Sequence, residues 1–201
     1  MVWHPIHGAD MRSDISLEIH GTIKDASTFN AIIEDALEAN EDARLAAADA
    51  GTGQYDDLRA VARHIESVAA EGNVLCLSLE DTRYEFANLR DALRAGGVGF
   101  RYTVHGERDY ALSFRPGMKA EIEHDISLDD EPVLSFADVN KAHKEQGGIE
   151  KLLERAGIAC FLPDGARIEV APGVFEQWIR EYASDPEADQ TSEAGVTTWT
   201  R

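Results

Sequence analysis

Hydrophobic and polar positions alternate strictly along residues 14–24. Ile15, Leu17 and Ile19 fall on one face of an extended chain, and polar side chains occupy the positions between them. Strict alternation is typical of a β-strand that buries one face and leaves the other wet. The pattern therefore predicts a half-buried strand at the start of the fold.

Two segments that follow repeat their apolar positions at helical spacing. Within residues 27–50, the apolar side chains from Phe29 to Leu37 fall on one side of a helix, and the periodicity fails near Asn40. We therefore expect a break or kink at that residue. Residues 56–70 predict a second helix with its own apolar side, capped by an aspartate at its first position.

The stretch 73–125 predicts the centre of the fold. It opens with an apolar run at 74–79, as in a strand covered on both faces, and a capping box at 82–85 predicts a helix over 84–95. A strand, a helix and another strand favour a right-handed parallel crossover. Alternating segments then predict an antiparallel meander of three strands, at 100–105, 110–115 and 119–125.

The loop between the last two strands of this meander decides which side chains share a face. A three-residue loop sets Leu112 opposite Ile122, and Ser113 opposite Glu121. A two-residue Pro-Gly turn instead sets Leu112 opposite Glu121 and places acids on the apolar face. Because a slip of one residue turns every side chain over, we favour the three-residue loop. It predicts a polar outer row of Arg101, Ser113 and Glu121.

These elements predict an α/β (α+β) fold: a mixed sheet with a parallel crossover and an antiparallel meander, and helices on at least one face. An acidic run at 129–132 marks a boundary, so residues 13–126 are expected to form the main α/β domain. Residues 132–182 predict a small C-terminal α/β appendage packed on it, with two helices, a β-hairpin over 158–170 and a last helix. Residues 183–201 have the composition of a disordered acidic tail.

Charge narrows the classes of partner. The 201 residues include 38 acidic and 19 basic side chains, for a formal net charge of −19. Such a chain repels nucleic acid phosphates and anionic membranes and attracts basic protein surfaces. Residues 136–170 resemble the outline of a winged helix, but their acidic and basic side chains balance, so we expect no direct nucleic acid binding. Acidity is equally typical of a soluble protein adapted to a salt-rich environment.

Cysteine usage and hydropathy bear on the compartment. Cys76 and Cys160 are far apart, lack a CxxC partner and lie in apolar runs, where a free cysteine behaves as a small hydrophobe. No stretch approaches the roughly 20 apolar residues of a membrane span. The first residues do not combine a basic and an apolar region as a secretory signal does. We therefore expect a cytoplasmic protein with no membrane partner.

Signatures of catalysis are weak. The sequence contains no GxSxG or HExxH motif. His105 and Asp109 could meet in a loop as an acid–base pair, although loop tips are usually just polar. His124 and Asp125 are neighbours on a predicted strand and point to opposite faces, so they do not form a metal pair. We expect no metal site and no cofactor, and a non-enzymatic protein.

Two rows of carboxylates are the best candidates for a function. One row repeats every four residues on a predicted helix, where like charges destabilise the free helix, and the other repeats every two residues on a strand. A solvated polar face is the plain alternative. The candidate partner-binding residues are Glu34, Glu38, Asp42, Glu121, Glu123 and Asp125.

The sequence therefore predicts a non-enzymatic intracellular acidic protein that engages a basic partner surface. In its sharpest form it is an inhibitor that mimics a nucleic acid, because spaced carboxylates can imitate a phosphate backbone. The alternative is a small-molecule-binding enzyme or sensor whose pocket lies near the aromatic hairpin, beside His105 and His124. A deep pocket holding both histidines would favour that alternative.

Overall fold

The computed structural model describes residues 13–39, 54–82 and 85–183. The predicted break near Asn40 and the acidic tail from residue 184 onward lie outside the described residues. The described helices are α1 (Ala26–Ala39), α3 (Gln54–Ala70), α4 (Ala87–Ala95), α5 (Phe136–His143), α6 (Gly148–Cys160) and α7 (Val174–Tyr182). The described strands are β1 (Ser13–Ile23), β2 (Leu75–Thr82), β3 (Gly99–His105), β4 (Tyr110–Phe114), β5 (Ile122–Asp125) and β6 (Ile168–Val170).

The strands form a mixed sheet that is mostly antiparallel. Its order is β2-β1-β3-β4-β5, with every neighbouring pair antiparallel, and β6 pairs in parallel with the end of β1. The fold is therefore α+β, as the sequence predicted. The predicted right-handed parallel crossover through α4 is not confirmed: β2 and β3 do not pair, because β1 lies between them and is antiparallel to both.

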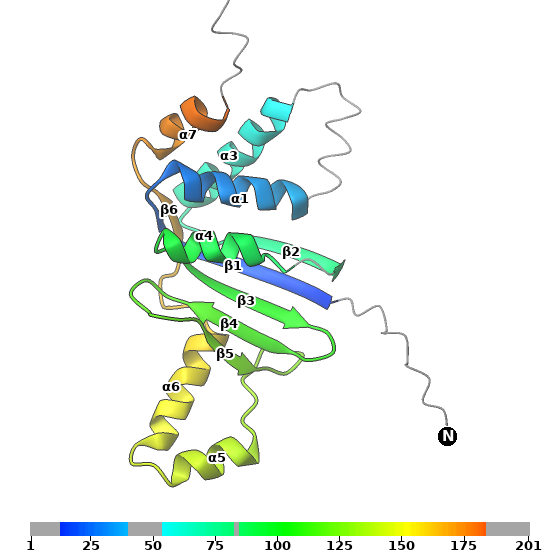
Figure 1. Ribbon diagram of the computed structural model, residues 1–201, viewed down its shortest axis with the longest axis vertical. Helices are drawn as coiled ribbons and strands as arrows, with labels where there is room; N and C mark the ends of the chain where they lie inside the picture. Colours follow the sequence, from blue (N-terminus) through cyan, green and yellow to red (C-terminus); the bar gives the residue numbers. More distant parts are fainter. Residues whose placement is uncertain (1–12, 40–53, 83–84, 184–201) are drawn as a thin grey trace, which may run out of the picture.

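Helices cover both faces of the sheet, but unequally. Figure 1 shows α1, α3, α4 and α7 on one side and the pair α5–α6 on the other. Apolar side chains of the four helices join those of the strands in one large buried cluster, the main core. On the opposite face α6 packs against β4 and β5, and a smaller buried cluster forms there.

The predicted aromatic hairpin is confirmed. Tyr102 lies opposite Leu112, and Phe100 lies opposite Phe114 with ring centroids 6.0 Å apart. All four side chains are buried on the face that packs against the main core. Alternation over β1, β3 and β4 thus located the core correctly, because one face of these strands carries large apolar groups and the other does not.

The predicted register of β5 is wrong. Leu112 lies opposite Glu123, and Ser113 lies opposite Ile122. The sequence argument assumed that one face of β5 is wet, but α6 covers that face, so Ile122 packs there with the small buried cluster. The row of Arg101 and Ser113 does exist as cross-strand neighbours, but Glu121 is not its third member.

The C-terminal elements also differ from the predicted appendage. Residues 158–160 continue α6, so the predicted β-hairpin over 158–170 is wrong. Its second half forms β6, which pairs with β1, and α7 packs on α1. A separate C-terminal unit is therefore not confirmed. Among the described helices, only α5 and α6 lie on the far face of the sheet (Figure 1).

α4 begins later than the predicted capping box. Thr82 still belongs to β2, and the N-cap of α4 is Phe86, which has φ 49° and no side-chain hydrogen bond. Its ring is fully buried in the main core. A non-glycine residue in the left-handed region is strained, and we infer that burial of the aromatic ring offsets that strain.

α7 is fixed to α1 by one buried polar contact. The indole Nε1 of Trp178 donates to Oδ1 of Asn30 at 3.0 Å, and both side chains are buried. The indole also packs edge-on against Phe29, with ring centroids 5.8 Å apart. A buried N–H group that loses its acceptor is costly, so this contact specifies how α7 docks.

Replacing Asn30 tests that contact. Asn30→Ala should lower the free energy of unfolding by about 1–3 kcal/mol, because the indole N–H is left buried without an acceptor. Denaturant titration followed by tryptophan fluorescence measures it. Glu34→Ala is the matched control: this exposed carboxylate accepts from Asn30 Nδ2, and its loss should cost less than about 0.5 kcal/mol. Equal losses in the two variants would contradict the role assigned to the indole contact.

His20 gives the fold a dependence on pH. Its imidazole is buried above Gly99, where a Cβ atom would lie 2.2 Å from His20 Cε1. Burial, and next the charge of Arg115, lowers the pKa of His20 below its ordinary value of 6.5. The unfolded chain therefore takes up the proton first, so the stabilisation is present above pH 6.5 and is lost as the pH falls below it.

A neutral substitute should reduce this loss. His20→Asn is expected to lose less stability than the wild type between neutral and mildly acidic pH, each protein compared with its own value at neutral pH. Thermal unfolding across the pH series measures the difference. His64→Asn, at an exposed position of α3, should follow the wild type. An unchanged slope in His20→Asn would show that other groups set the acid sensitivity.

Candidate protein-binding site

The pair of helices α5–α6 is fixed to the sheet at the C-terminal end of α6. From here on, 'the hairpin' means this helix pair and not the β3–β4 strands. Ser113 Oγ donates to the carbonyl of Ala159 at 2.9 Å, and Arg101 Nη1 donates to that of Cys160 at 2.5 Å. Arg115 Nη2 donates to the carbonyl of Phe161 at 3.1 Å. The last carbonyls of a helix have no partner within it, so strand side chains cap α6 from outside. Two of the three donors are cations, which also favour the negative end of the helix dipole.

Arg101 connects this junction to the neighbouring loop. Its guanidinium forms an ion pair with Glu18 and lies 3.6 Å from Asp130 Oδ2. Asp130 has φ 61°, an uncommon conformation for a residue other than glycine, and its other oxygen lies 2.9 Å from His105 Nε2. The arginine side chain is only 15% exposed, so removing it would leave two partly buried carboxylates without this counter-charge.

The sequence placed His105 and Asp109 together, and the structure does so as well. His105 Nδ1 lies 3.4 Å from Asp109 Oδ1, while Asp130 approaches the other ring nitrogen. The nearby thiol of Cys160 is buried, and burial raises its pKa to about 11. A thiol that stays protonated at neutral pH is a poor nucleophile. The histidine therefore links two loops, and the cluster lacks an activated cysteine.

The hairpin itself turns tightly. Ser135 Oγ accepts from the backbone N–H of Asp138 at 3.1 Å and caps α5. Gly147 has φ 66°, which only glycine adopts without strain. At Gly148 a Cβ atom would lie 2.1 Å from the carbonyl oxygen of Ala142. The two glycines thus permit the close approach of α5 to α6, and Figure 1 shows α5 beyond the sheet at that end of the molecule.

A groove runs along the hairpin to the edge of β5. One cavity of about 240 Å³ lies between the two helices, and a second of about 210 Å³ lies beside β5. Both are lined by Asp138, Leu152 and Arg155. Each is smaller than the roughly 300–1,000 Å³ of a typical small-molecule site. The second includes His124 but not His105, so this groove does not provide the pocket that the enzyme alternative requires.

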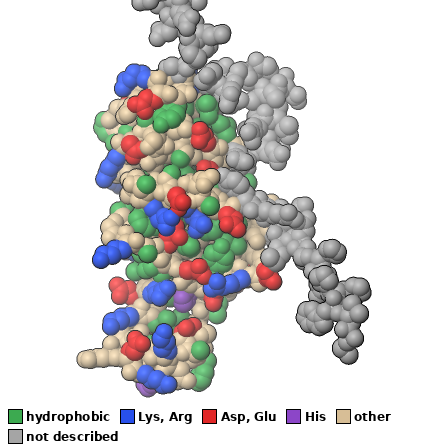
Figure 2. Space-filling view, in the orientation of Figure 1, with side chains coloured by type: hydrophobic (Ala, Val, Ile, Leu, Met, Phe, Trp, Pro, Cys, Tyr) green, Lys and Arg blue, Asp and Glu red, His purple; other side chains and the backbone are tan. Residues whose placement is uncertain are grey.

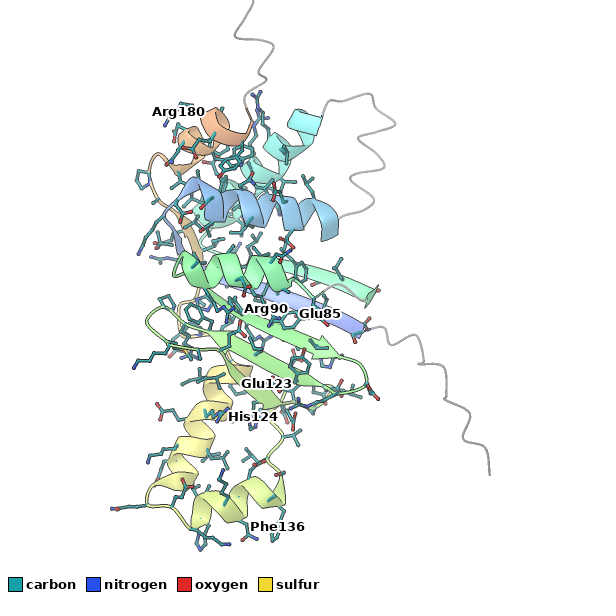
Figure 3. The ribbon with its side chains drawn as sticks, in the orientation of Figure 1. Glu85, Arg90, Glu123, His124, Phe136 and Arg180 are labelled. Carbon is teal, nitrogen blue, oxygen red and sulfur yellow. The ribbon has the colours of Figure 1, made fainter. Side chains whose placement is uncertain are left out.

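Four large apolar side chains on α5, on α6 and in the loop before α5 are exposed, and one of them, Val133, lines the cavity beside β5. Phe136, on the first turn of α5, is 81% exposed, and Leu128, in the preceding loop, is 79% exposed. Val133 and Leu153 are also exposed. Figure 3 shows Phe136 at the end of α5, away from the sheet. Large apolar groups exposed together mark interaction surfaces more often than singly scattered ones do, and the sequence periodicity of α5 gave no sign of this cluster.

The predicted strand row of carboxylates is neutralised within the molecule. Glu121 forms ion pairs with Arg90 and Arg94 of α4, each at 3.7 Å. Glu123 and Asp125 both bind Arg108, at 2.7 and 2.5 Å. Three strand carboxylates thus stabilise the edge of the sheet, and partner binding would have to compete with these arginines.

The helix row is described only in part. Glu34 is exposed and accepts a hydrogen bond from Asn30 Nδ2 at 2.9 Å. The side chain of Glu38 and all of Asp42 lie outside the described residues. Figure 2 shows acidic and basic side chains interspersed on the face it presents, without a continuous acidic band.

Another cavity lies away from the hairpin. A cavity of about 320 Å³ lies between α1 and α4, but its carboxylate, Asp25, already accepts from the Thr28 N–H at 2.8 Å and caps α1. No group of three or more histidine, cysteine or acidic side chains in the described part could hold a metal ion. None of the described helices is long and apolar enough to cross a membrane.

Comparison with known proteins adds no relationship. No family model, no curated protein and no solved structure matches the chain significantly.

Cys160 offers a native test of the junction between α6 and the sheet. Arg101→Met in a Cys76→Ser background should lower the free energy of unfolding by about 1.5–3 kcal/mol, because the carbonyl of Cys160 loses a charged donor. It should also speed the reaction of Cys160 with a thiol reagent, because the last turn of α6 loses its cap and opens more often. Denaturant titration and thiol labelling under native conditions measure the two effects.

Arg108→Met in the same background is the control. Arg108 has a side chain 59% exposed; it pairs with two carboxylates of β5 and lies over the ring of Tyr110, and none of the contacts given for it reaches α6. Its removal should leave Cys160 labelling close to that of the parent. If Arg101→Met labels no faster than Arg108→Met, Arg101 does not hold the hairpin in place.

Proposed function

We propose that the protein is a non-enzymatic binding module that engages a partner protein through the α5–α6 hairpin. The observation that carries the proposal is the exposed aromatic ring of Phe136 on an element that projects from the sheet. An exposed phenylalanine contributes little to a free monomer. In a complex, an aromatic ring that enters a pocket is a common centre of binding energy.

The apolar surface is extended enough to act as a site. Leu128, Val133 and Phe136 follow one another within nine residues of chain, and Val133 also lines the groove beside β5. The groove has an apolar floor at Ala142 and Leu152. Apolar anchors surrounded by polar side chains are the usual composition of a protein interface.

The hairpin carries no net charge, whereas the whole chain is strongly acidic and repels acidic partners. Residues 135–160 hold as many basic as acidic side chains, on a chain whose net charge is −19. Lys141, Lys151 and Arg155 line the groove and form no ion pair within the described residues. A partner approaching the hairpin therefore meets local neutrality and free cations, instead of the acidic surplus of the rest of the chain.

The junction with the sheet makes this surface a rigid one. The C-terminal turn of α6 is held by Arg101, Ser113 and Arg115, and α5 packs on α6. A binding surface ordered before the encounter loses less conformational entropy when the complex forms.

Net charge favours a second candidate, binding of a basic partner surface by carboxylates. Because the row at 121–125 is paired internally, α1 would carry it, starting at the exposed Glu34. Inhibition by nucleic-acid mimicry is one form of this candidate. The two candidates differ in salt dependence: salt screens contacts between exposed charges and leaves apolar contacts intact.

Substitution of Phe136 separates the candidates. The wild type, Phe136→Ala, Tyr182→Ala and Glu34→Gln are used to capture partners from the source cell at low and high salt, with quantitative mass spectrometry. A hairpin partner should be retained by the wild type and Tyr182→Ala at both salt levels, and reduced at least about tenfold by Phe136→Ala. Tyr182 is the matched control because it is a partly exposed aromatic residue, 37% exposed, on the distant helix α7.

Thermal unfolding confirms that all variants fold. A partner lost at high salt, insensitive to Phe136→Ala and reduced by Glu34→Gln would instead support the carboxylate candidate. If no captured protein depends on Phe136 or on salt, neither candidate holds.

A further inference from the structure

The two edges of the sheet are treated differently. β5 is a short edge strand, and the chain folds back over it: the Val133 N–H donates to the Asp125 carbonyl at 2.9 Å, and Ile126 forms a bridge with Pro132. β2, at the other edge, is eight residues long. Among the described strands, only β1 pairs with it, so its outer backbone donors and acceptors have no strand partner in the described part of the chain.

β2 has few of the features that usually protect an exposed edge, and these lie at its end: its pairing with β1 shifts register between residues 79 and 82, where Glu80 and Asp81 also lie. The segment 75–80 contains no proline and no lysine, and its one charged residue, Glu80, lies at the end. Cys76 and Ser78 are exposed on the face away from the main core, while Leu79 is only half-buried on the core face. The segment 75–79 keeps a regular register with β1, and a regular, weakly charged edge is a template for further pairing.

We propose that β2 pairs antiparallel with β2 of a second copy of this chain, so that the two sheets become continuous across a two-fold axis. The sequence around Leu77 favours a second copy as the occupant. Residues 75–79 read Leu-Cys-Leu-Ser-Leu, so their polarity is the same in both directions. Self-complementarity is what a two-fold interface requires.

The register follows from the faces. Residues directly opposite in an antiparallel pair share a face, so an axis through Leu77 sets Leu75 of one copy opposite Leu79 of the other. Cys76 then lies opposite Ser78 on the polar face. The leucines of the two copies then lie side by side on the face that carries the helices. This contact covers the part of Leu79 that is exposed in the single chain.

The acidic charge of the two copies weakens this pairing but does not prevent it. With the axis at Leu77, Glu80 of one copy lies opposite Val74 of the other, so no carboxylates of the strand face each other. The net charge of −19 on each copy still repels at long range. Because that repulsion is screened over about 8 Å at physiological ionic strength, added salt should tighten the dimer.

Sedimentation of the full chain tests the proposal. The wild type should show a monomer–dimer equilibrium within the range up to about 100 μM, and the dimer should become tighter on going from about 0.15 to about 0.5 M salt. Ser78→Lys puts a charge on the exposed face at the centre of β2 and should weaken dimerisation at least about tenfold. Ser67→Lys makes the same change in charge at an exposed site of α3 and should dimerise like the wild type.

Amide hydrogen exchange tests whether β2 forms the dimer interface. In the wild type, exchange within residues 75–82 should slow as protein concentration rises, and this effect should be absent in Ser78→Lys while the other strands stay protected. Phe136→Ala should change neither measurement, which separates this interface from the hairpin. A wild type that is monomeric over the whole range overturns the proposal, as does a dimer that Ser78→Lys leaves intact.

Discussion

The capping of α6 by side chains of the sheet is the interaction on which the rest of the arrangement depends. Arg101, Ser113 and Arg115 project from the face that does not carry the main core, and each donates to a carbonyl at the end of α6. The carbonyls at the end of a helix have no partner within it, and the contact at Ala159 is buried, so its carbonyl could not turn to water instead. The polar face of the sheet thus specifies where a helix docks, a role more often taken by an apolar face.

This docking also explains where prediction from sequence succeeded and failed. Alternation in β1, β3 and β4 identified the core face, since one face of these strands is consistently apolar. It failed at β5, where Ile122 packs in the small buried cluster beside α6 and Glu123 lies on the opposite face of the strand. β5 does alternate, with Ile122 and His124 half-buried and Glu123 and Asp125 exposed, but its more buried face is the one that α6 covers, and the sequence does not show where α6 packs. Neither does a sequence reveal that residues 158–160 end a helix instead of starting a strand, because both states bury Cys160.

Charge spacing was a poorer guide than hydrophobic spacing. The row Glu121, Glu123 and Asp125 has the regular repeat expected of a binding face, yet arginines from α4 and the loop before β4 neutralise all three. Those arginines are distant in sequence from the carboxylates they bind, so the local sequence pattern does not predict these ion pairs. The candidate surface that remains, around Phe136, consists of apolar groups that only the tertiary structure leaves uncovered.

The net charge can then be understood together with the edges of the sheet. Natural proteins that leave an edge strand open need some device against uncontrolled pairing, and within residues 75–79 β2 carries none. A net charge of −19 distributed over the molecule supplies a long-range repulsion that grows with each added copy. In the proposed dimer, the β2 edge of each copy is paired with that of the other. The opposite edge, β5, is covered by the chain that follows it, so no open edge remains among the described strands. Assembly through β2 therefore closes at two copies, and the acidity keeps such pairs apart from one another.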